Sequence, residues 1–112
     1  MADLIHANTA EEFKKEVLDF DWVVLVDFYA DRCGPCKMLS PIMEELDHDY
    51  ADKKNVKIVK IDVDQNQDTA WEFGVMSIPT VYLFKNWESV FNQTGVSPKW
   101  VYENKINEAL GQ

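Results

Sequence analysis

Two short runs rich in β-branched and aromatic residues constrain the fold more than any other feature of the sequence. They are WVVLVDFYA at residues 22–30 and VKIVKIDV at residues 56–63. In the first run the apolar residues occupy consecutive positions, as in a strand covered on both faces, and the second run is also typical of a buried strand. The sequence therefore predicts a sheet whose central strands lie between layers of helices.

The remaining elements are predicted from helical spacing, turn residues and capping signals. Helices are expected at residues 8–20, 33–51, 68–74 and 97–110, and further strands at 4–7, 80–84 and 89–94. Thr9 and Glu12 have the spacing of a capping box, and Ser97 and Pro98 are expected at the cap and first position of the last helix. Strands that alternate with helices and end in a hairpin imply an α/β fold with a mixed five-stranded sheet and four helices in three layers.

Length and charge exclude several classes of protein. A chain of 112 residues is expected to form one domain, residues 1–112, with a core that needs no cross-link or metal. The net charge of −9 repels phosphate backbones and anionic lipid headgroups, and no apolar run is long enough to cross a bilayer. Neither nucleic acid nor a membrane is therefore an expected partner.

The first residues lack the pattern of a secretory signal, so we expect a cytoplasmic protein.

The two cysteines of the chain, Cys33 and Cys36, allow three interpretations. As a structural disulfide they would close a very short loop, which stabilises a fold by only roughly 2 kcal/mol and does not persist in a reducing compartment. As a zinc site they would need His6 and His48 to complete four ligands, and neither histidine has finger-like spacing. The third interpretation is a reversible redox dithiol.

The position of the cysteines favours the redox dithiol. Cys33 follows a predicted strand and opens a predicted helix, where unpaired N–H groups stabilise a thiolate and make this sulfur the attacking one. Cys36 lies within reach to act as the resolving thiol, which expels the reduced substrate and leaves a Cys33–Cys36 disulfide. Gly34 and Pro35 between them carry no charge that would further stabilise the thiolate, so the pair is expected to be a reductant.

Three segments carry a resemblance to a known family. They are CGPCK at residues 33–37, with VLVDFYA at 24–30 before it and IPT at 78–80 after it. With these motifs the sequence resembles the thioredoxin family over nearly its whole length. The resemblance implies the thioredoxin fold, reduction of protein disulfides as a monomer, and no bound cofactor or metal. Because the chain has no glycine-rich dinucleotide fingerprint, its electrons are expected from another protein. The resemblance implies that this protein is a flavin-dependent thioredoxin reductase that draws on NADPH.

The resemblance also implies roles for individual residues. Asp27 would be a buried acid with a raised pKa that accepts the proton of Cys36, whereas its alternative is a strand-end aspartate that faces water. Lys60 would be its charge partner, although a lysine in such a strand is more often solvated. A cis peptide bond is implied before Pro79. The residues implied to line the substrate-docking rim are Arg32, Gly34, Pro35, Val63, Ser77, Ile78, Pro79, Gly95 and Val96.

The chain departs from the family pattern at three positions. Arg32 stands where tryptophan commonly precedes the first cysteine, and Tyr29 stands where another tryptophan is common. A guanidinium beside the nucleophile predicts a lower Cys33 pKa than in an Arg32→Trp variant, and hence a weaker reductant. The third departure is Trp87, where the hairpin normally has Asn-Gly; because tryptophan at positive φ is strained, a longer turn or another turn type is expected.

Two other functions remain open on the sequence alone. An oxidase or isomerase could use the same fold, and a measured reduction potential well above that of the glutathione pool would favour it. A binding module could use the fold merely to hold a partner. Such a module would keep its function when both cysteines are replaced by serine, whereas an oxidoreductase would lose it.

Overall fold

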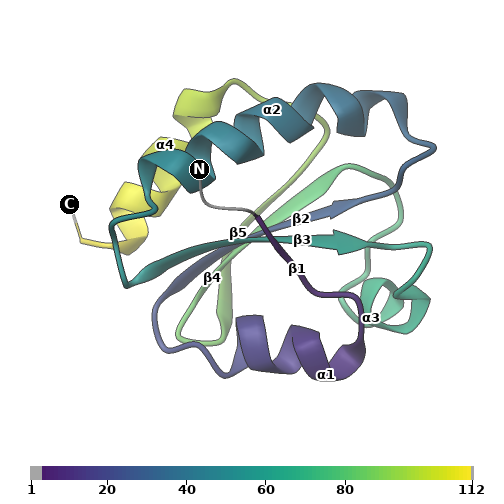
Figure 1. Ribbon diagram of the computed structural model, residues 1–112, viewed down its shortest axis with the longest axis horizontal. Coiled ribbons are helices and arrows are strands. Elements are labelled where there is room, and N and C mark those ends of the chain that lie inside the picture. Colours follow the sequence, from purple (N-terminus) through teal and green to yellow (C-terminus); the bar gives the residue numbers. More distant parts are fainter. Residues whose placement is uncertain (1–3, 112) are drawn as a thin grey trace.

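The computed structural model describes residues 4–111, and its centre is a five-stranded sheet (Figure 1). The strands lie in the order β1 (Ile5–His6), β3 (Val56–Asp62), β2 (Val23–Tyr29), β4 (Thr80–Lys85) and β5 (Glu88–Thr94). β1, β3 and β2 pair in parallel, whereas β4 and β5 are antiparallel to their neighbours. The mixed sheet and the predicted strand order along the chain are confirmed.

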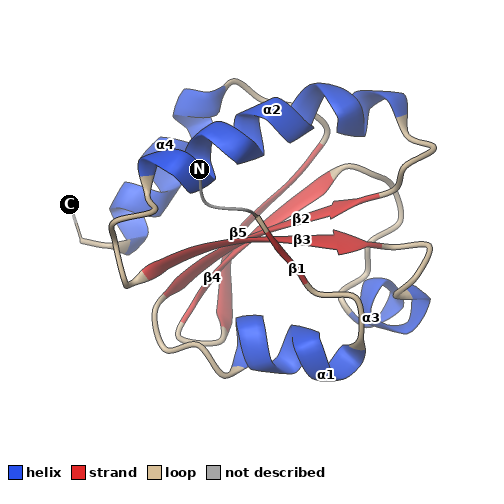
Figure 2. Ribbon diagram, in the orientation of Figure 1, coloured by secondary structure: helices blue, strands red, loops and turns tan. Residues whose placement is uncertain are grey.

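Helices cover both faces of this sheet (Figure 2). α2 (Gly34–Asp49) and α4 (Lys99–Ala109) lie on one face, and α1 (Ala10–Phe13) and α3 (Gln67–Glu72) lie on the other. α1 continues directly into a π-helical segment, η1 (Lys14–Leu18). The sheet is therefore the middle of three layers, as the sequence predicts.

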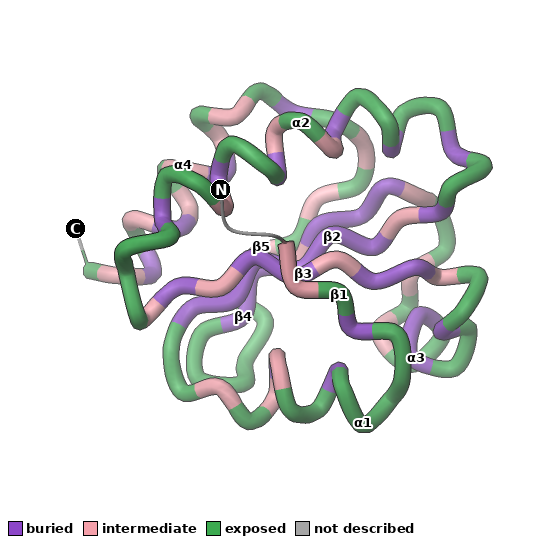
Figure 3. The backbone as a smooth tube through the Cα atoms, in the orientation of Figure 1, coloured by how far each residue is buried: buried purple, intermediate pink, exposed green. Residues whose placement is uncertain are grey.

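The apolar run in β2 fills both hydrophobic cores. Val23 and Leu25 pack into the core beneath α2 and α4, whereas Val24, Val26 and Phe28 pack into the core beneath α1 and α3. Successive side chains of a strand point to opposite faces, so a strand with a core on each side needs apolar residues at consecutive positions. Figure 3 shows this burial along the central strands, with exposed residues gathered on the helices and turns.

The helix ends differ slightly from the sequence-based expectation. Thr9 caps α1 by accepting a hydrogen bond from the Glu12 N–H at 3.0 Å, as the capping box predicts. At the start of α4 the cap is Pro98 and the first helical residue is Lys99, so the expected positions of Ser97 and Pro98 are both wrong by one residue. Ser97 is buried instead, and its N–H donates to the Tyr102 hydroxyl at 3.1 Å.

The β4–β5 hairpin turns through Asn86 and Trp87. Lys85 pairs directly with Glu88, so the turn has two residues and both adopt positive φ, 49° for Asn86 and 73° for Trp87. The expected longer or different turn is therefore wrong. A two-residue turn with both central residues at positive φ matches the right-handed twist of the flanking strands. This fit outweighs the steric cost of positive φ for tryptophan.

Replacing Trp87 by glycine is expected to stabilise the fold by about 1 kcal/mol, because glycine adopts positive φ without steric cost. The Trp87 side chain is exposed, so little packing is lost. Urea titration of wild type and Trp87→Gly measures the change. Glu88→Gly is the matched control, since it places glycine in β5 and should destabilise the protein. An equal or lower unfolding midpoint for Trp87→Gly would contradict the prediction.

Candidate functional site

The two cysteines lie at the junction between β2 and α2. β2 ends at Tyr29, a turn closed by the Cys33 N–H to Ala30 carbonyl bond at 3.1 Å follows, and α2 begins at Gly34. Cys33 is the N-cap of α2, and its sulfur accepts a hydrogen bond from the Cys36 N–H at 3.1 Å. Cys33 and Cys36 form a disulfide with their Cα atoms 5.2 Å apart. The Cys33 sulfur thus faces the positive end of a helix, as expected.

Segments distant in the sequence surround the disulfide. Val63 after β3 and Ile78 before β4 both pack against the buried cluster of Ala30, Cys33 and Cys36. The Ile78 carbonyl oxygen lies 3.7 Å from the Cys33 sulfur, and the Ile78–Pro79 bond is cis, as the resemblance implies. Of the rim positions, Pro79 is buried, Val63, Ile78 and Gly95 are partly buried, and Arg32, Gly34, Pro35, Ser77 and Val96 are exposed.

A hydrogen bond joins one more rim residue to this loop. The Gly95 N–H donates to the Pro79 carbonyl at 2.8 Å, which holds the end of β5 beside the cis bond. Val96 follows Gly95 and is 37% exposed. The structure therefore brings the 63, 78–79 and 95–96 positions to the edge of the sheet at which the disulfide lies.

Asp27 is fully buried in β2, so its water-facing alternative is wrong. It lies on the same face of the strand as Val23 and Leu25, beneath α2, the helix that carries Cys36. Neither carboxylate oxygen has a hydrogen-bond partner among the described residues. Loss of hydration raises the pKa of Asp27 from 3.8 to about 7, although the positive charge of Lys60 opposes this rise.

Lys60 lies beside Asp27 without a direct bond to it. The two residues pair in register across β2 and β3, so their side chains share a face of the sheet. The Lys60 ammonium instead donates to the Ser40 hydroxyl of α2 at 3.3 Å and lies 4.3 Å from the centre of the Tyr29 ring. Lys60 therefore acts on Asp27 through its charge, and of the two groups that hold it, the sequence reasoning did not single out Ser40.

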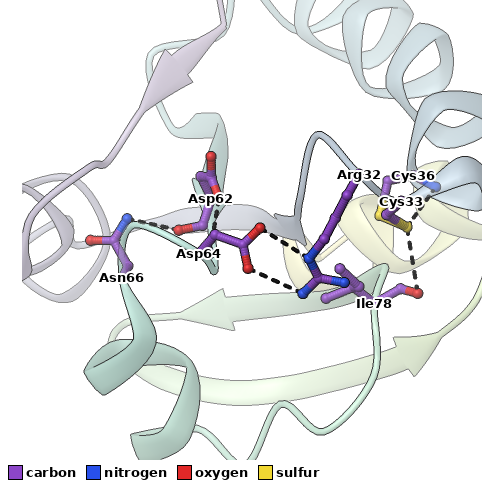
Figure 4. A network of polar contacts seen from close by, with 7 residues as sticks. All are labelled: Arg32, Cys33, Cys36, Asp62, Asp64, Asn66 and Ile78. Carbon is purple, nitrogen blue, oxygen red and sulfur yellow. Dashed lines mark hydrogen bonds and ion pairs between the residues drawn. A yellow bond between two sulfur atoms is a disulfide. The ribbon is translucent and has the colours of Figure 1, made fainter.

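Arg32 forms a bidentate ion pair with Asp64 (Figure 4). Its Nε and Nη2 donate to the two carboxylate oxygens of Asp64, both at 3.1 Å. The side chain extends toward Asp64 and away from the sulfur atoms in this view. The guanidinium expected next to Cys33 is thus paired with an anion, and the lower Cys33 pKa relative to an Arg32→Trp variant stays a prediction.

Asp64 is a site residue that the sequence reasoning missed, although the sequence carried a signal for it. β2 and β3 are parallel neighbours, so their carboxyl ends meet at one edge of the sheet. Arg32 comes three residues after the end of β2, and Asp64 comes two residues after the end of β3. Opposite charges that follow adjacent parallel strands are candidates for an ion pair.

A pocket of about 290 Å³ opens beside Cys36. Its lining residues are Tyr29, Ala30, Asp31, Cys36, Lys37, Ser40 and Lys60.

Among residues 4–111, no group of three or more histidine, cysteine, aspartate or glutamate side chains is arranged to hold a metal ion. Within the same range, no helix has the length and apolar character needed to span a membrane.

Comparison with known proteins gives consistent results. The family model of thioredoxin matches residues 4–108. The chain is 46% identical to a thioredoxin of Haemophilus influenzae over 98% of its own length and 100% of that protein, and 52% identical to a thioredoxin of Bacillus subtilis over 79% and 83%. Among solved structures, a mutant thioredoxin from Halobacterium salinarum superposes with a TM-score of 0.83 at 36% identity, covering 96% of this chain and 90% of that one.

Proposed function

The chain belongs to the thioredoxin family and is a protein-disulfide reductase, and we propose that Cys33 is its nucleophile, Cys36 its resolving thiol and Asp27 its internal proton acceptor. One observation carries this assignment. The Cys33 sulfur lies at the N-terminus of α2 and accepts the Cys36 N–H, the geometry that favours a thiolate at this position.

In the first step the Cys33 thiolate attacks one sulfur of a substrate disulfide. A bond forms between Cys33 and that sulfur, the substrate S–S bond breaks, and the other substrate sulfur leaves as a thiolate that takes a proton from water. Cys33 is the N-cap of α2 and is 8% exposed, whereas Cys36 lies within the first turn and is 4% exposed. Attack by Cys33 on an incoming protein is therefore favoured.

In the second step Cys36 attacks the sulfur of Cys33. Its thiol proton passes to the Asp27 carboxylate, and the Cys33–Cys36 bond forms as the bond between Cys33 and the substrate sulfur breaks. That substrate sulfur leaves as a thiolate and takes a proton from water. The substrate gains two electrons and the enzyme dithiol loses them. An acid with a pKa of about 7 is divided between its two protonation states at neutral pH, so Asp27 can take this proton and later return it.

The docking rim is proposed to bind an extended substrate segment. Partly buried Val63 and Ile78 offer apolar contact on one side of the disulfide, and exposed Gly34 and Pro35 leave the other side open. Backbone groups around Ile78 would pair with the substrate main chain, which gives affinity without dependence on its sequence. Ser77, Pro79, Gly95, Val96 and Arg32 would complete the rim.

The supply of electrons is the other part of the proposal. No dinucleotide fingerprint occurs in the sequence, so a flavin-dependent thioredoxin reductase that draws on NADPH would regenerate the dithiol. We further propose that the protein acts in the cytoplasm as a monomer, without cofactor or metal. The whole chain, 1–112, would form one domain, of which residues 1–3 and 112 lie outside the described part.

The function is tested by reduction of insulin disulfides with dithiothreitol as electron donor. Wild-type protein is expected to accelerate precipitation of the reduced insulin B chain, because dithiothreitol regenerates the dithiol after each turnover. Cys33→Ser is expected to have the rate of dithiothreitol alone. Equal rates for wild type and Cys33→Ser would contradict the proposed nucleophile.

A further inference from the structure

We propose that Asp64 is a positioning residue of the redox centre, which holds the Arg32 guanidinium away from the Cys33 sulfur and offsets its positive charge. The inference rests on the proposed role of Cys33 as nucleophile. Asp64 is not one of the proposed docking-rim residues and takes no part in the proposed proton transfer. Its ion pair with Arg32 stands beside the disulfide in Figure 4.

The geometry of the pair sets the direction of the guanidinium, and the exposure of both side chains, 67% for Arg32 and 47% for Asp64, keeps the strength of the pair modest. Arg32 lies in the turn that ends at Cys33, so its side chain starts one residue from the attacking sulfur. A free arginine there would sample positions near the thiolate, because opposite charges attract. Two parallel hydrogen bonds of 3.1 Å to one carboxylate fix the plane and the direction of the guanidinium, which a single bond would not.

The backbone of Asp64 is held in place by hydrogen bonds within its own loop. Its N–H donates to the Asp62 carboxylate at 2.9 Å, and the Asn66 side-chain amide donates to the Asp62 carbonyl at 3.0 Å. Asp62 and Asn66 are only 6% and 7% exposed. The Val63 N–H donates to the Tyr29 carbonyl at 2.8 Å, which ties this loop to the end of β2. Because the backbone of Asp64 is already ordered by these bonds, only side-chain freedom of Asp64 and Arg32 is lost when the pair forms.

The consequence concerns the charge that the Cys33 thiolate experiences. A lone cation next to the sulfur would lower its pKa, and a lone carboxylate would raise it. With Arg32 and Asp64 paired, the two effects oppose each other and the N-terminus of α2 dominates. The other charged groups around the centre are Asp31 and Lys37 on either side of the cysteines in the chain, Asp27 and Lys60 on the strands below, and Asp62 in the Asp64 loop.

The test is a thiolate titration of the reduced protein by ultraviolet absorbance, in wild type, Asp64→Asn, Arg32→Gln and the double variant. Asp64→Asn is expected to lower the Cys33 pKa by about 0.3 to 0.5 units, because the exposed guanidinium becomes free to approach the sulfur. Alkylation by iodoacetamide at pH 6 should then be about two- to threefold faster. Arg32→Gln should shift the pKa upward, since it leaves Asp64 unpaired.

The double variant separates positioning from direct repulsion. If Asp64 acts through Arg32, then Asp64→Asn lowers the pKa less than half as much when Arg32 is already glutamine. An equal lowering in both backgrounds would mean that Asp64 acts directly on the sulfur, and no lowering would mean that the pair is inert; either result overturns the proposal. Asp64→Glu should restore a pKa close to wild type, because it keeps both the charge and the acceptor oxygens.

Two controls complete the experiment. Asp68→Asn removes one negative charge at the beginning of α3 without removing the carboxylate that Arg32 binds, and should leave the titration close to wild type. A shift as large as that of Asp64→Asn would overturn the proposal, because net charge alone would then explain it. Cys33→Ser should abolish the titration; its persistence would overturn the nucleophile assignment as well. Insulin reduction by Asp64→Asn distinguishes failure of the Asp64 proposal from failure of the proposed function. Asp64→Asn should still reduce insulin even if the Asp64 proposal fails.

Discussion

Cys36→Ser is expected to accumulate a covalent complex between Cys33 and a disulfide-containing substrate, with turnover reduced by about a thousandfold or more. The complex forms because Cys33 still attacks, and it persists because the intramolecular thiol that resolves it is missing. An intramolecular nucleophile of good geometry is equivalent to a very high concentration of external thiol, which is the origin of the large effect. Incubation with insulin followed by non-reducing gel electrophoresis and mass spectrometry measures the complex.

The control variants assign the trapped sulfur. Cys33→Ser and the double serine variant should yield no covalent complex, and dithiothreitol should release the complex of Cys36→Ser within minutes. If Cys33→Ser traps substrate while Cys36→Ser does not, the two cysteines have the opposite roles. If neither traps substrate, the exchange mechanism is wrong.

We expect wild-type protein to lose stability as the pH rises from 4 to 8. We expect the Asp27→Ala variant to show little of this decline. The folded protein holds the Asp27 proton up to a pKa of about 7, whereas the unfolded chain releases it near 3.8. Stability therefore falls as the pH rises from about 4 to about 7 and then levels off. The difference between the two pKa values corresponds to roughly 4 kcal/mol at pH 8.

Urea unfolding at several pH values measures this effect. The wild-type curve should decline relative to that of Asp27→Ala, which lacks the buried carboxyl. Asp21→Ala removes an exposed aspartate just before β2 and should decline in parallel with wild type. Parallel curves for wild type and Asp27→Ala would show that Asp27 does not titrate abnormally in the folded state.

The same variant tests the role of Asp27 in catalysis. If the carboxylate takes the Cys36 proton, Asp27→Ala should slow release of substrate from the Cys33 mixed disulfide by at least about tenfold at pH 7. The deficit should shrink at higher pH, where the Cys36 thiol ionises without help. A release rate equal to that of wild type would contradict the proton-acceptor role and leave the stability prediction untouched.

Local patterns predicted most of the fold. The consecutive apolar residues of β2 predicted a strand buried on both faces, and each of its faces does pack into a core. Short-range signals failed where a tertiary constraint opposed them. Trp87 adopts positive φ because the pairing of β4 with β5 leaves two residues for the turn, and Ser97 is buried under Tyr102 and therefore does not cap α4.

The site was predicted in part. The spacing of Cys33 and Cys36 at the start of a helix indicated the redox centre, because helix geometry places residues of that spacing within reach of each other. Asp27 was ambiguous, since a carboxylate in an apolar strand can point into the core or toward its end. Its burial under α2 settled the question of exposure, and the proposed role in proton transfer depends on that burial.

By itself, the sequence determined the order of the elements and the location of the reactive sulfurs, because both depend on residues that are neighbours along the chain. Only the tertiary structure decided which charges face each other. Asp64 meets Arg32, and Lys60 contacts Ser40 and Tyr29, because parallel strand pairing and the packing of α2 bring those groups together. Electrostatic interactions depend on distance in space and on burial, and neither quantity is encoded in local periodicity.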